Sequence, residues 1–371
     1  MPKIIFADGG TAGHILPILA IVREIQAAKS NDPKLKIFYI GPNERYILQL
    51  LEKENVAIKK IVCGKLRRYF SFKNFIDIFK IPIGFFQSLF WLFVLAPDMV
   101  FSKGGYGSVP VTFAAYLLQI PIFLHESDSF PGLSSRVESK WAVEIFTSFP
   151  KTDYLKPEKI ICSGNPIRQE ILNGNPEEAK KIFNLAGGKP IVSFLGGSQG
   201  AQSINNIILE ILPELLNQFE IIHQTGRNNF EQTRNEADAL MSPTVKKFYH
   251  PVPFLNEKEM KGLLTVSSVI ISRAGAGAIF EIAASGKPAI LIPLPGAAGN
   301  HQAKNGYQFA DAGAGEVLEE QNLKPHFLLE KIKYLLSRED ILQAFSTNSV
   351  NFGKPKAAKL IADYLLAYLE H

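Results

Sequence analysis

Short runs rich in Val, Ile and Phe alternate with longer helical patterns along the chain, and this alternation limits the possible fold more than any other feature. Such an order is typical of β–α units with parallel strands, whose two faces are covered by the intervening helices. The strand candidates are KIIFA, KIFYI, MVF and IFLHE in the first half, and IVSFLG, EIIHQTG, VIIS and AILIP in the second. The sequence therefore predicts an α/β fold with doubly wound parallel sheets, which bind ligands at the carboxyl ends of their strands.

The two halves repeat one layout, because a first strand ends in GGT at residues 9–11 in one half and in GGS at 196–198 in the other. With 371 residues, the chain is also too long for one ordinary core. We therefore expect two lobes, residues 1–164 and 165–349, joined by a hinge in the segment CSGNPIRQEI. A last helix, at about 350–371, is expected to pack back onto the first lobe.

Composition narrows the class of protein. The formal net charge is +5 and the basic residues are spread out, which argues against a nucleic-acid binder. The two cysteines, Cys63 and Cys162, are far apart, which argues against a disulfide framework and a zinc site and fits a reducing cytoplasm.

The start MPKIIFA lacks a secretory signal pattern, so we expect the protein to stay inside the cell. The apolar run Ile81–Ala96 is shorter than the about 20 residues of a spanning helix, so we expect a buried helix there.

Three glycine-rich loops follow predicted strands: GGTAGH at 9–14, GGSQGA at 196–201 and SRAGAGAIFEIAASG at 272–286. Free N–H groups at a helix start, with no Cβ in the way, let a phosphate approach the backbone. GGSQGA alone is equally consistent with a tight turn capped by Ser198. No loop combines GxGxxG with an acid about twenty residues later, and no GxxxxGK[ST] occurs, which argues against dinucleotide oxidoreduction and P-loop hydrolysis.

Polar side chains at the predicted strand ends indicate acid–base and sugar chemistry. His14 lies at a helix start, and Glu126 and Asp128 lie on a neighbouring strand-end loop, so a proton could be taken from a hydroxyl there. Glu281 falls early in a helix, where a carboxylate can bind ribose hydroxyls, although a solvated helix glutamate is the simpler interpretation of that residue alone. Gln302 and its neighbours in NHQAKN suit sugar hydroxyls or helix capping.

A set of motifs extends through almost the whole chain: GGTAGH, SKGGYGSVP, HESD, GNPIR, GGSQGAQSIN, HQTG, SRAGAGAIFEIAASGKP and NHQAKN. In this order and spacing they resemble the MurG family of bacterial N-acetylglucosaminyltransferases, within glycosyltransferase family 28. The resemblance implies a GT-B fold, in which two Rossmann-like lobes face each other across a cleft that holds the active site. It also implies an inverting transfer of GlcNAc from UDP-GlcNAc to the C4 hydroxyl of MurNAc in lipid I, which gives lipid II for peptidoglycan synthesis.

The resemblance assigns roles to residues at matching motif positions. Arg168 and Ser198 would contact the nucleotide-sugar, with Ser198 at the diphosphate. Leu255 would meet uracil through its backbone, and Gln302 would hold the GlcNAc hydroxyls. The loop that wraps the phosphates and the ribose would consist of Ala276, Gly277, Ala278, Ile279, Phe280 and Glu281. From the opposite lobe, the residues that would close on the sugar and the acceptor are Thr11, Ala12, Gly13 and Asp128.

For the reaction itself, the resemblance leads us to expect that His14, alone or aided by Glu126, takes the proton from the attacking hydroxyl. Helix N-termini would stabilise the departing UDP, so neither a metal nor another cofactor is expected to be required. The sequence departs from the family pattern at Asp128, where the family usually has Asn, and at Ala274, where serine is commoner.

A lipid acceptor requires a membrane surface, and the stretch KLRRYFSFKNFIDIFK at Lys65–Lys80 combines aromatic and cationic side chains. The residues expected to contact an anionic membrane are Arg67, Arg68, Tyr69, Phe70, Phe72, Lys73, Phe75, Phe79 and Lys80. We therefore expect a peripheral protein on the cytoplasmic face of the cell membrane. Other cell-wall or division proteins are further candidate partners.

Three alternatives stay open at the level of sequence. One is a related lipid glycosyltransferase with a diacylglycerol acceptor, and another is a UDP-GlcNAc epimerase with the same two-lobe fold. The third is a non-catalytic scaffold that binds a nucleotide-sugar as a signal. Release of UDP only in the presence of a lipid acceptor would separate transfer from epimerisation, and any turnover would exclude the scaffold.

Overall fold

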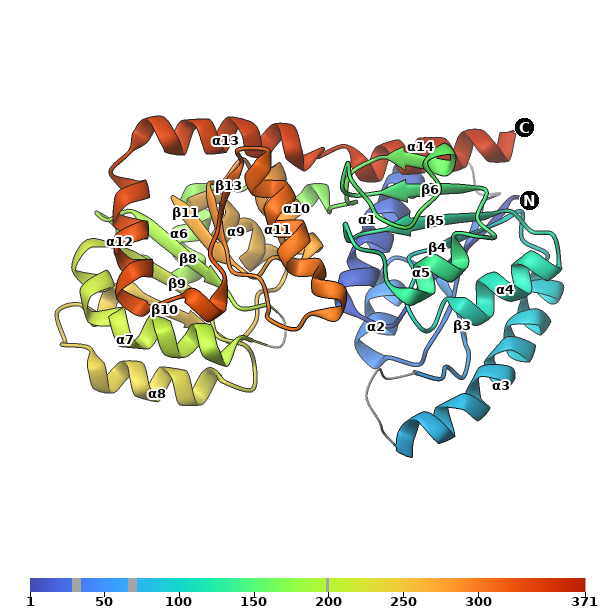
Figure 1. Ribbon diagram of the computed structural model, residues 1–371, viewed down its shortest axis with the longest axis horizontal. Helices are drawn as coiled ribbons and strands as arrows, with labels where there is room; N and C mark the ends of the chain where they lie inside the picture. The colour runs from blue at the N-terminus through green and yellow to red at the C-terminus, as the bar shows by residue number, and fades with distance from the viewer. Residues whose placement is uncertain (29–34, 66–71, 198–199, 371) are drawn as a thin grey trace. The chain divides into compact units, whose positions relative to one another are not determined.

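The computed structural model describes residues 1–28, 35–65, 72–197 and 200–370. The chain divides into two compact units. Unit 1 consists of Met1–Arg168 together with Lys356–His371, and unit 2 consists of Gln169–Pro355. Figure 1 shows that each unit is built around its own sheet. The chain passes from unit 1 to unit 2 after Arg168 and returns after Pro355.

Unit 1 contains a seven-stranded parallel sheet in the order β3-β2-β1-β4-β5-β6-β7. Its strands are β1 (Lys3–Ala7), β2 (Lys36–Gly41), β3 (Ala57–Lys60), β4 (Met99–Ser102), β5 (Ile122–Glu126), β6 (Glu144–Thr147) and β7 (Ile160–Cys162). Its helices are α1 (Ala12–Ala28), α2 (Arg45–Lys53), α3 (Phe72–Leu95), α4 (Val109–Leu117), α5 (Leu133–Glu138) and α14 (Ala357–Glu370), with a 3₁₀ turn η1 (Pro157–Lys159).

Alternate residues of the central strand face two separate cores in unit 1. Ile4 and Phe6 join the cluster formed with α1, α2 and α14, and α14 lies beside α1 in Figure 1. Ile5 and Ala7 join the cluster on the other face, which includes residues of α3 and α4. Burial on both faces explains why this strand reads as a continuous apolar run.

Unit 2 contains a six-stranded parallel sheet in the order β10-β9-β8-β11-β12-β13. Its strands are β8 (Ile191–Leu195), β9 (Glu220–Gln224), β10 (Tyr249–Val252), β11 (Val269–Ser272), β12 (Ala289–Leu291) and β13 (Gly315–Val317). Its helices are α6 (Pro176–Phe183), α7 (Gln202–Gln218), α8 (Phe230–Leu240), α9 (Glu257–Val266), α10 (Ala276–Ala284), α11 (His301–Asp311), α12 (Pro325–Leu336) and α13 (Glu339–Gly353). Short 3₁₀ turns are η2 (Gln169–Ile171), η3 (Lys246–Phe248), η4 (Ala298–Asn300) and η5 (Glu320–Asn322).

The prediction of doubly wound parallel sheets is confirmed. Each of the eight predicted runs contains a strand, and these strands lie towards the middle of the two sheets. The sequence interpretation missed β3, β6, β7, β10 and β13. These strands lie at or near the edges of the sheets, where less of each strand is buried and a short segment such as AIKK or GEV is not a continuous apolar run.

The prediction of a buried helix at Ile81–Ala96 is wrong. Helix α3 extends over 24 residues and continues through Pro82. Its segment Asp77–Leu95 is long and apolar enough to cross a membrane by length and composition, and only 17% of that window is buried. Only one face of α3 packs on the unit, through residues such as Leu92 and Ser88, so most of its apolar side chains face outward.

Candidate active site

The loop between β1 and α1 brings two backbone segments close together. A Cβ at Gly9 would lie 2.7 Å from the Cα of Gly105 and 2.8 Å from Nδ1 of His14. Gly10 adopts a φ of 75°, which is the left-handed region that glycine occupies without strain. Gly9 is thus required for the close approach of the loop after β4, and His14 packs directly against this pair of loops.

His14 lies in the first turn of α1, where its backbone N–H donates to the carbonyl of Thr11 at 3.0 Å. Its Nδ1 atom is buried and has no hydrogen-bond partner among the residues that the structure describes. Burial, and then the charge of Lys103, lower the pKa of His14 to about 3. The imidazole is therefore neutral at neutral pH and can accept a proton. Thr11 and Gly13 on either side of Ala12 are exposed.

Glu126 is the last residue of β5, and Asp128 lies in the loop that follows it. Glu126 is 5% exposed and accepts a hydrogen bond from the backbone N–H of Asp128 at 2.8 Å. Burial, and then the negative charge of Asp128, raise the pKa of Glu126. Neither a hydrogen bond nor an ion pair joins the described side chains of His14 and Glu126, so the two predicted catalytic groups do not form a dyad here.

Lys103 links these two parts of the site, although the sequence interpretation did not single it out. It follows β4, is 2% exposed, and its ammonium group donates to the hydroxyl of Ser127. Burial lowers its pKa to about 8, while the carboxylates of Glu126, Asp128 and Asp8 oppose that shift. Its charge also acts on His14. The signal that could have found it is its position directly after a strand, at the head of the SKGGYGS loop.

Asp8 is a second buried ionisable group that the sequence interpretation missed. Its Oδ1 accepts hydrogen bonds from the hydroxyl of Tyr39 at 2.6 Å and from the backbone N–H of Gly10 at 2.9 Å. Its Oδ2 is buried without a hydrogen-bond partner among the described residues. Burial raises the pKa of Asp8 to about 6. The buried carboxyl group of Asp8 therefore contacts the glycine loop and fixes it through the hydrogen bond from Gly10.

The corresponding loop of unit 2 joins β8 to α7. Ser198, the residue predicted at the diphosphate, lies outside the described residues. Gly200 has a φ of 77°, and a Cβ there would lie 2.4 Å from the carbonyl oxygen of Thr225. This glycine therefore permits a close approach to the loop after β9. Arg168, expected at the nucleotide-sugar, is 9% exposed and is the last residue of unit 1.

The start of α10 offers backbone donors more than side chains. The N-cap residue Gly275 has no side chain with which to cap the helix, and Cβ atoms at Gly275 and Gly277 would meet no atom within 4 Å. Ile279 and Phe280 are buried, and the Phe280 ring stacks on Phe352 with centroids 5.3 Å apart. These two residues can therefore meet a ligand only through their backbone. The uncapped N–H groups and the dipole of α10 form a site suited to a phosphate.

The remaining predicted donor residues differ in what they can offer. Ala276 is buried, whereas Ala278 and Glu281 are half-buried. Leu255 is 5% exposed, so a ligand could reach only its backbone. Gln302 is half-buried in the first turn of α11, and its Oε1 accepts the backbone N–H of Leu294 at 2.9 Å. That bond orients the side chain and leaves its amino group as the donor.

Arg273 ties together three segments at the carboxyl edge of the unit 2 sheet and was not singled out from the sequence. Its guanidinium donates to the carboxylate of Glu320, to the carbonyl of Ile292 at 3.3 Å and to the hydroxyl of Ser203 at 3.3 Å. Arg273 directly follows β11 at the start of the SRAGAGA loop, as Lys103 follows β4. This position after a strand is the sequence signal by which both residues could have been found.

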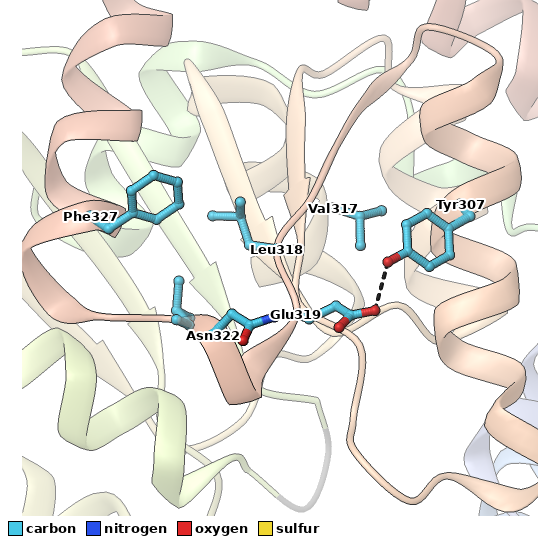
Figure 2. Close-up of a pocket in the computed structure, with 7 residues that line it drawn as sticks. Tyr307, Val317, Leu318, Glu319, Asn322 and Phe327 are labelled. Atoms are coloured by element: carbon cyan, nitrogen blue, oxygen red, sulfur yellow. Dashed lines mark hydrogen bonds between the residues drawn. The ribbon is translucent and has the colours of Figure 1, made fainter.

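A hollow of about 330 Å³ in unit 2 lies apart from these predicted residues (Figure 2). Its lining consists of Tyr307, Val317, Leu318, Glu319, Asn322, Leu323 and Phe327. The hydroxyl of Tyr307 donates to the carboxylate of Glu319 at 2.6 Å, a bond drawn as a dashed line in Figure 2. Within the described part of the chain, no group of three or more His, Cys, Asp or Glu side chains could hold a metal ion.

Comparisons with known proteins match nearly the whole chain to one family of glycosyltransferases. The profile of the glycosyltransferase family 28 N-terminal domain matches residues 4–147, and that of the family 28 C-terminal domain matches residues 191–361. A relative from Treponema denticola is 37% identical over 99% of this chain and 98% of its own length, and one from Clostridium tetani is 37% identical over 98% of each. Both are named UDP-N-acetylglucosamine--N-acetylmuramyl-(pentapeptide) pyrophosphoryl-undecaprenol N-acetylglucosamine transferase.

Solved structures share the fold at lower sequence identity. The crystal structure of Acinetobacter baumannii MurG is 24% identical with a TM-score of 0.74, over 99% of this chain and 100% of that one. A UDP-GlcNAc 2-epimerase from Neisseria meningitidis is 16% identical with a TM-score of 0.69, over 98% of this chain and 100% of that one. At these identities both matches establish the GT-B architecture alone.

Proposed function

Because the chain belongs to glycosyltransferase family 28, we propose that it transfers GlcNAc from UDP-GlcNAc to the C4 hydroxyl of MurNAc in lipid I and so produces lipid II. The observation that carries this proposal is the 37% identity over 98% or more of the chain to relatives named for that reaction. Glycine loops at the carboxyl ends of strands in both units, each leading into a helix, support binding of two phosphate-bearing substrates.

In this proposal, unit 2 binds the donor. The open, uncapped start of α10 receives the phosphates and ribose of UDP-GlcNAc, with Glu281 in the second turn of the helix as acceptor for the ribose hydroxyls. The oriented amino group of Gln302 donates to a GlcNAc hydroxyl. The charge that develops on the leaving UDP is then stabilised by helix N-termini, which suffices for departure without a metal or another cofactor.

Unit 1 binds the acceptor and activates its hydroxyl. The diphosphate of lipid I lies at the loop of Gly9 and Gly10 and the start of α1. His14 acts as the base through Nε2, since its Nδ1 is buried against the loop. A base with a pKa of about 3 is weak, but the negative charge of a bound diphosphate counteracts Lys103 and raises the pKa of His14 towards the range where proton transfer is efficient.

The lipid part of the acceptor requires a membrane contact, which we assign to the exposed stripe of α3. Among its most exposed side chains are Phe86 at 65%, Phe90 at 57% and Phe93 at 76%, and they recur at helical spacing along one face. The residues Phe113, Tyr116 and Leu117 of α4, which packs on α3, extend this apolar surface. Since Leu92 on the other face belongs to the core, α3 lies along the membrane interface and does not leave the unit to span the bilayer.

This surface overlaps the one expected at Lys65–Lys80 and continues beyond it along α3. Arg67, Arg68, Tyr69 and Phe70 lie outside the described residues, as do the side chains of Phe72 and Lys73. Phe75 and Phe79 are 68% and 60% exposed and belong to the stripe. Lys80 pairs with Asp77 at 2.7 Å and is half-exposed beside it. Phe75 and Phe79 of the predicted stretch therefore belong to the proposed membrane contact together with Phe86, Phe90 and Phe93.

The decisive experiment follows radiolabel from UDP-GlcNAc into a lipid-extractable disaccharide, with a short-chain lipid I analogue as acceptor. Label in that product, together with UDP release that depends on the acceptor, is the expected result. A diacylglycerol acceptor and an acceptor-free reaction run in parallel. Label in a glycosyl-diacylglycerol, or turnover of UDP-GlcNAc without acceptor, would replace the proposal by a different lipid transferase or an epimerase.

A further inference from the structure

Arg136 of α5 is held between two aromatic rings at the carboxyl edge of the unit 1 sheet. Its guanidinium carbon lies 3.9 Å from the ring centroid of Tyr154 and 4.5 Å from that of Phe130. The two rings meet edge to face with centroids 5.3 Å apart. The Nε–H of Arg136 donates to the carbonyl of Pro131 at 3.0 Å. Three contacts from two loops therefore set the orientation of one guanidinium.

The helix that carries Arg136 is anchored to the loops of the proposed acceptor site. The hydroxyl of Ser134 accepts the backbone N–H of Gly105 at 3.0 Å, and Gly105 is the residue that packs on Gly9. At the other end of α5, Glu138 is fully buried and accepts a hydrogen bond from the hydroxyl of Ser108 at 2.6 Å. Arg136 is thus fixed relative to the backbone that surrounds His14.

The terminal nitrogens of Arg136 make no hydrogen bond to a residue that the structure describes. Among the described residues, the side chain of Arg136 makes one hydrogen bond, the one from Nε, and it forms no ion pair. The side chain is half-exposed, so Nη1 and Nη2 can meet a ligand. Tyr154 contributes to this arrangement at a cost, because it adopts a φ of 63° that a residue with a Cβ rarely occupies, while the residue as a whole stays 66% exposed. A strained, exposed aromatic that orients an unpaired guanidinium is typical of a ligand site.

We propose that Arg136 binds a carboxylate of the peptide carried by the acceptor, as a bidentate pair through Nη1 and Nη2. The inference rests on the proposed function, which already assigns the two phosphate-bearing groups elsewhere: the donor to α10 and the acceptor diphosphate to the loop before α1. The part of the acceptor that remains is the peptide, and any peptide with a free C-terminus carries at least one carboxylate. A planar guanidinium fork matches that group in geometry and charge.

The test compares two acceptors, a lipid I analogue with free peptide carboxylates and the same analogue with its carboxylates amidated. Arg136→Gln is expected to raise the KM for the free-acid acceptor about tenfold or more and to leave the KM for the amidated acceptor unchanged, since a charge-assisted bidentate pair is lost only in the first case. Arg136→Lys, which keeps the charge and loses the fork, is expected to fall between the two. The KM for UDP-GlcNAc and kcat stay within about twofold of wild type.

Arg234→Gln serves as the matched control, because Arg234 also lies over an aromatic ring, that of Phe230 at 5.4 Å, but in unit 2. It should change neither acceptor KM. An equal rise for both acceptors in Arg136→Gln would show that Arg136 only clamps two loops, and no rise for the free acid would show that it does not bind the carboxylate; either result would overturn the inference. Transfer by the wild-type protein to either acceptor tests the proposed function separately, so the two failures are distinguishable.

Discussion

The buried carboxyl group of Asp8 should make the stability of unit 1 depend on pH in a way that one substitution removes. Burial raises the pKa of Asp8 from 3.8 to about 6. The folded state therefore binds this proton more tightly than the unfolded state, so the contribution of Asp8 to the free energy of unfolding is largest at low pH and falls as pH rises from about 4 to 6. Because the Asp8 side chain is fully buried, solvent does not screen its charge.

The size of this effect follows from the shift. About two pH units at about 1.4 kcal/mol per unit give about 3 kcal/mol between the two limits. Asp8→Asn keeps an acceptor for the hydroxyl of Tyr39 and the N–H of Gly10, but it carries no proton to titrate. Its buried amino group adds an unpaired donor that costs about 1–3 kcal/mol at every pH. The difference in unfolding free energy between the variant and the wild type should therefore move by about 3 kcal/mol in favour of Asp8→Asn from pH 3.5 to pH 7.5.

Tryptophan fluorescence is the appropriate assay, because the chain's two tryptophans, Trp91 and Trp141, both lie in unit 1. Urea titrations at a series of pH values then report the unfolding of that unit. The pH dependence that comes from other buried groups, such as Glu138, whose pKa is raised to about 7 by burial, is the same in both proteins and cancels in the comparison. Tyr39→Phe is the companion variant, since loss of its hydrogen bond should raise the pKa of Asp8 further. A difference that stays constant with pH, or moves in favour of the wild type, would show that the pKa of Asp8 is not raised in the folded state.

Three further predictions concern the reaction, the loop and the membrane contact. His14→Ala should lower kcat by about 10²–10⁴ and leave UDP-GlcNAc binding by calorimetry unchanged, and near wild-type turnover would exclude His14 as the base. Gly9→Ala should destabilise unit 1 by about 1–3 kcal/mol in the same fluorescence assay, because its Cβ would lie 2.7 Å from the Cα of Gly105, and an unchanged midpoint would contradict that packing. Phe86→Ser and Phe93→Ser should each weaken flotation with anionic liposomes about tenfold, whereas equal flotation of variant and wild type would move the contact elsewhere.

The sequence predicted the parts of the fold in which local pattern and burial agree. The central strands are covered on both faces, so runs such as KIIFA and VIIS are apolar throughout and could be recognised. The edge strand β13 has the sequence GEV, and its assignment depends on pairing with β12, a contact that no local pattern records. The prediction for helix α3 was wrong for a different reason. An apolar run is expected to be buried in a protein that is surrounded by water, but it is equally consistent with an exposed surface that contacts lipid.

The same distinction applies to the candidate site: its glycine loops could be predicted from the sequence, whereas its buried charged residues could not. The glycine loops could be found because close approach and a positive φ each demand the residue type, as at Gly9 and Gly10. A charged residue at a strand end, by contrast, can point into solvent or under a loop, and the sequence is the same in both cases. Lys103 is buried because three carboxylates, those of Asp8, Glu126 and Asp128, offset its charge, and they come from two other strand ends. The cost of burying each charge is offset only when the folded sheet brings them together, so their role follows from the topology and could not be predicted from any one motif.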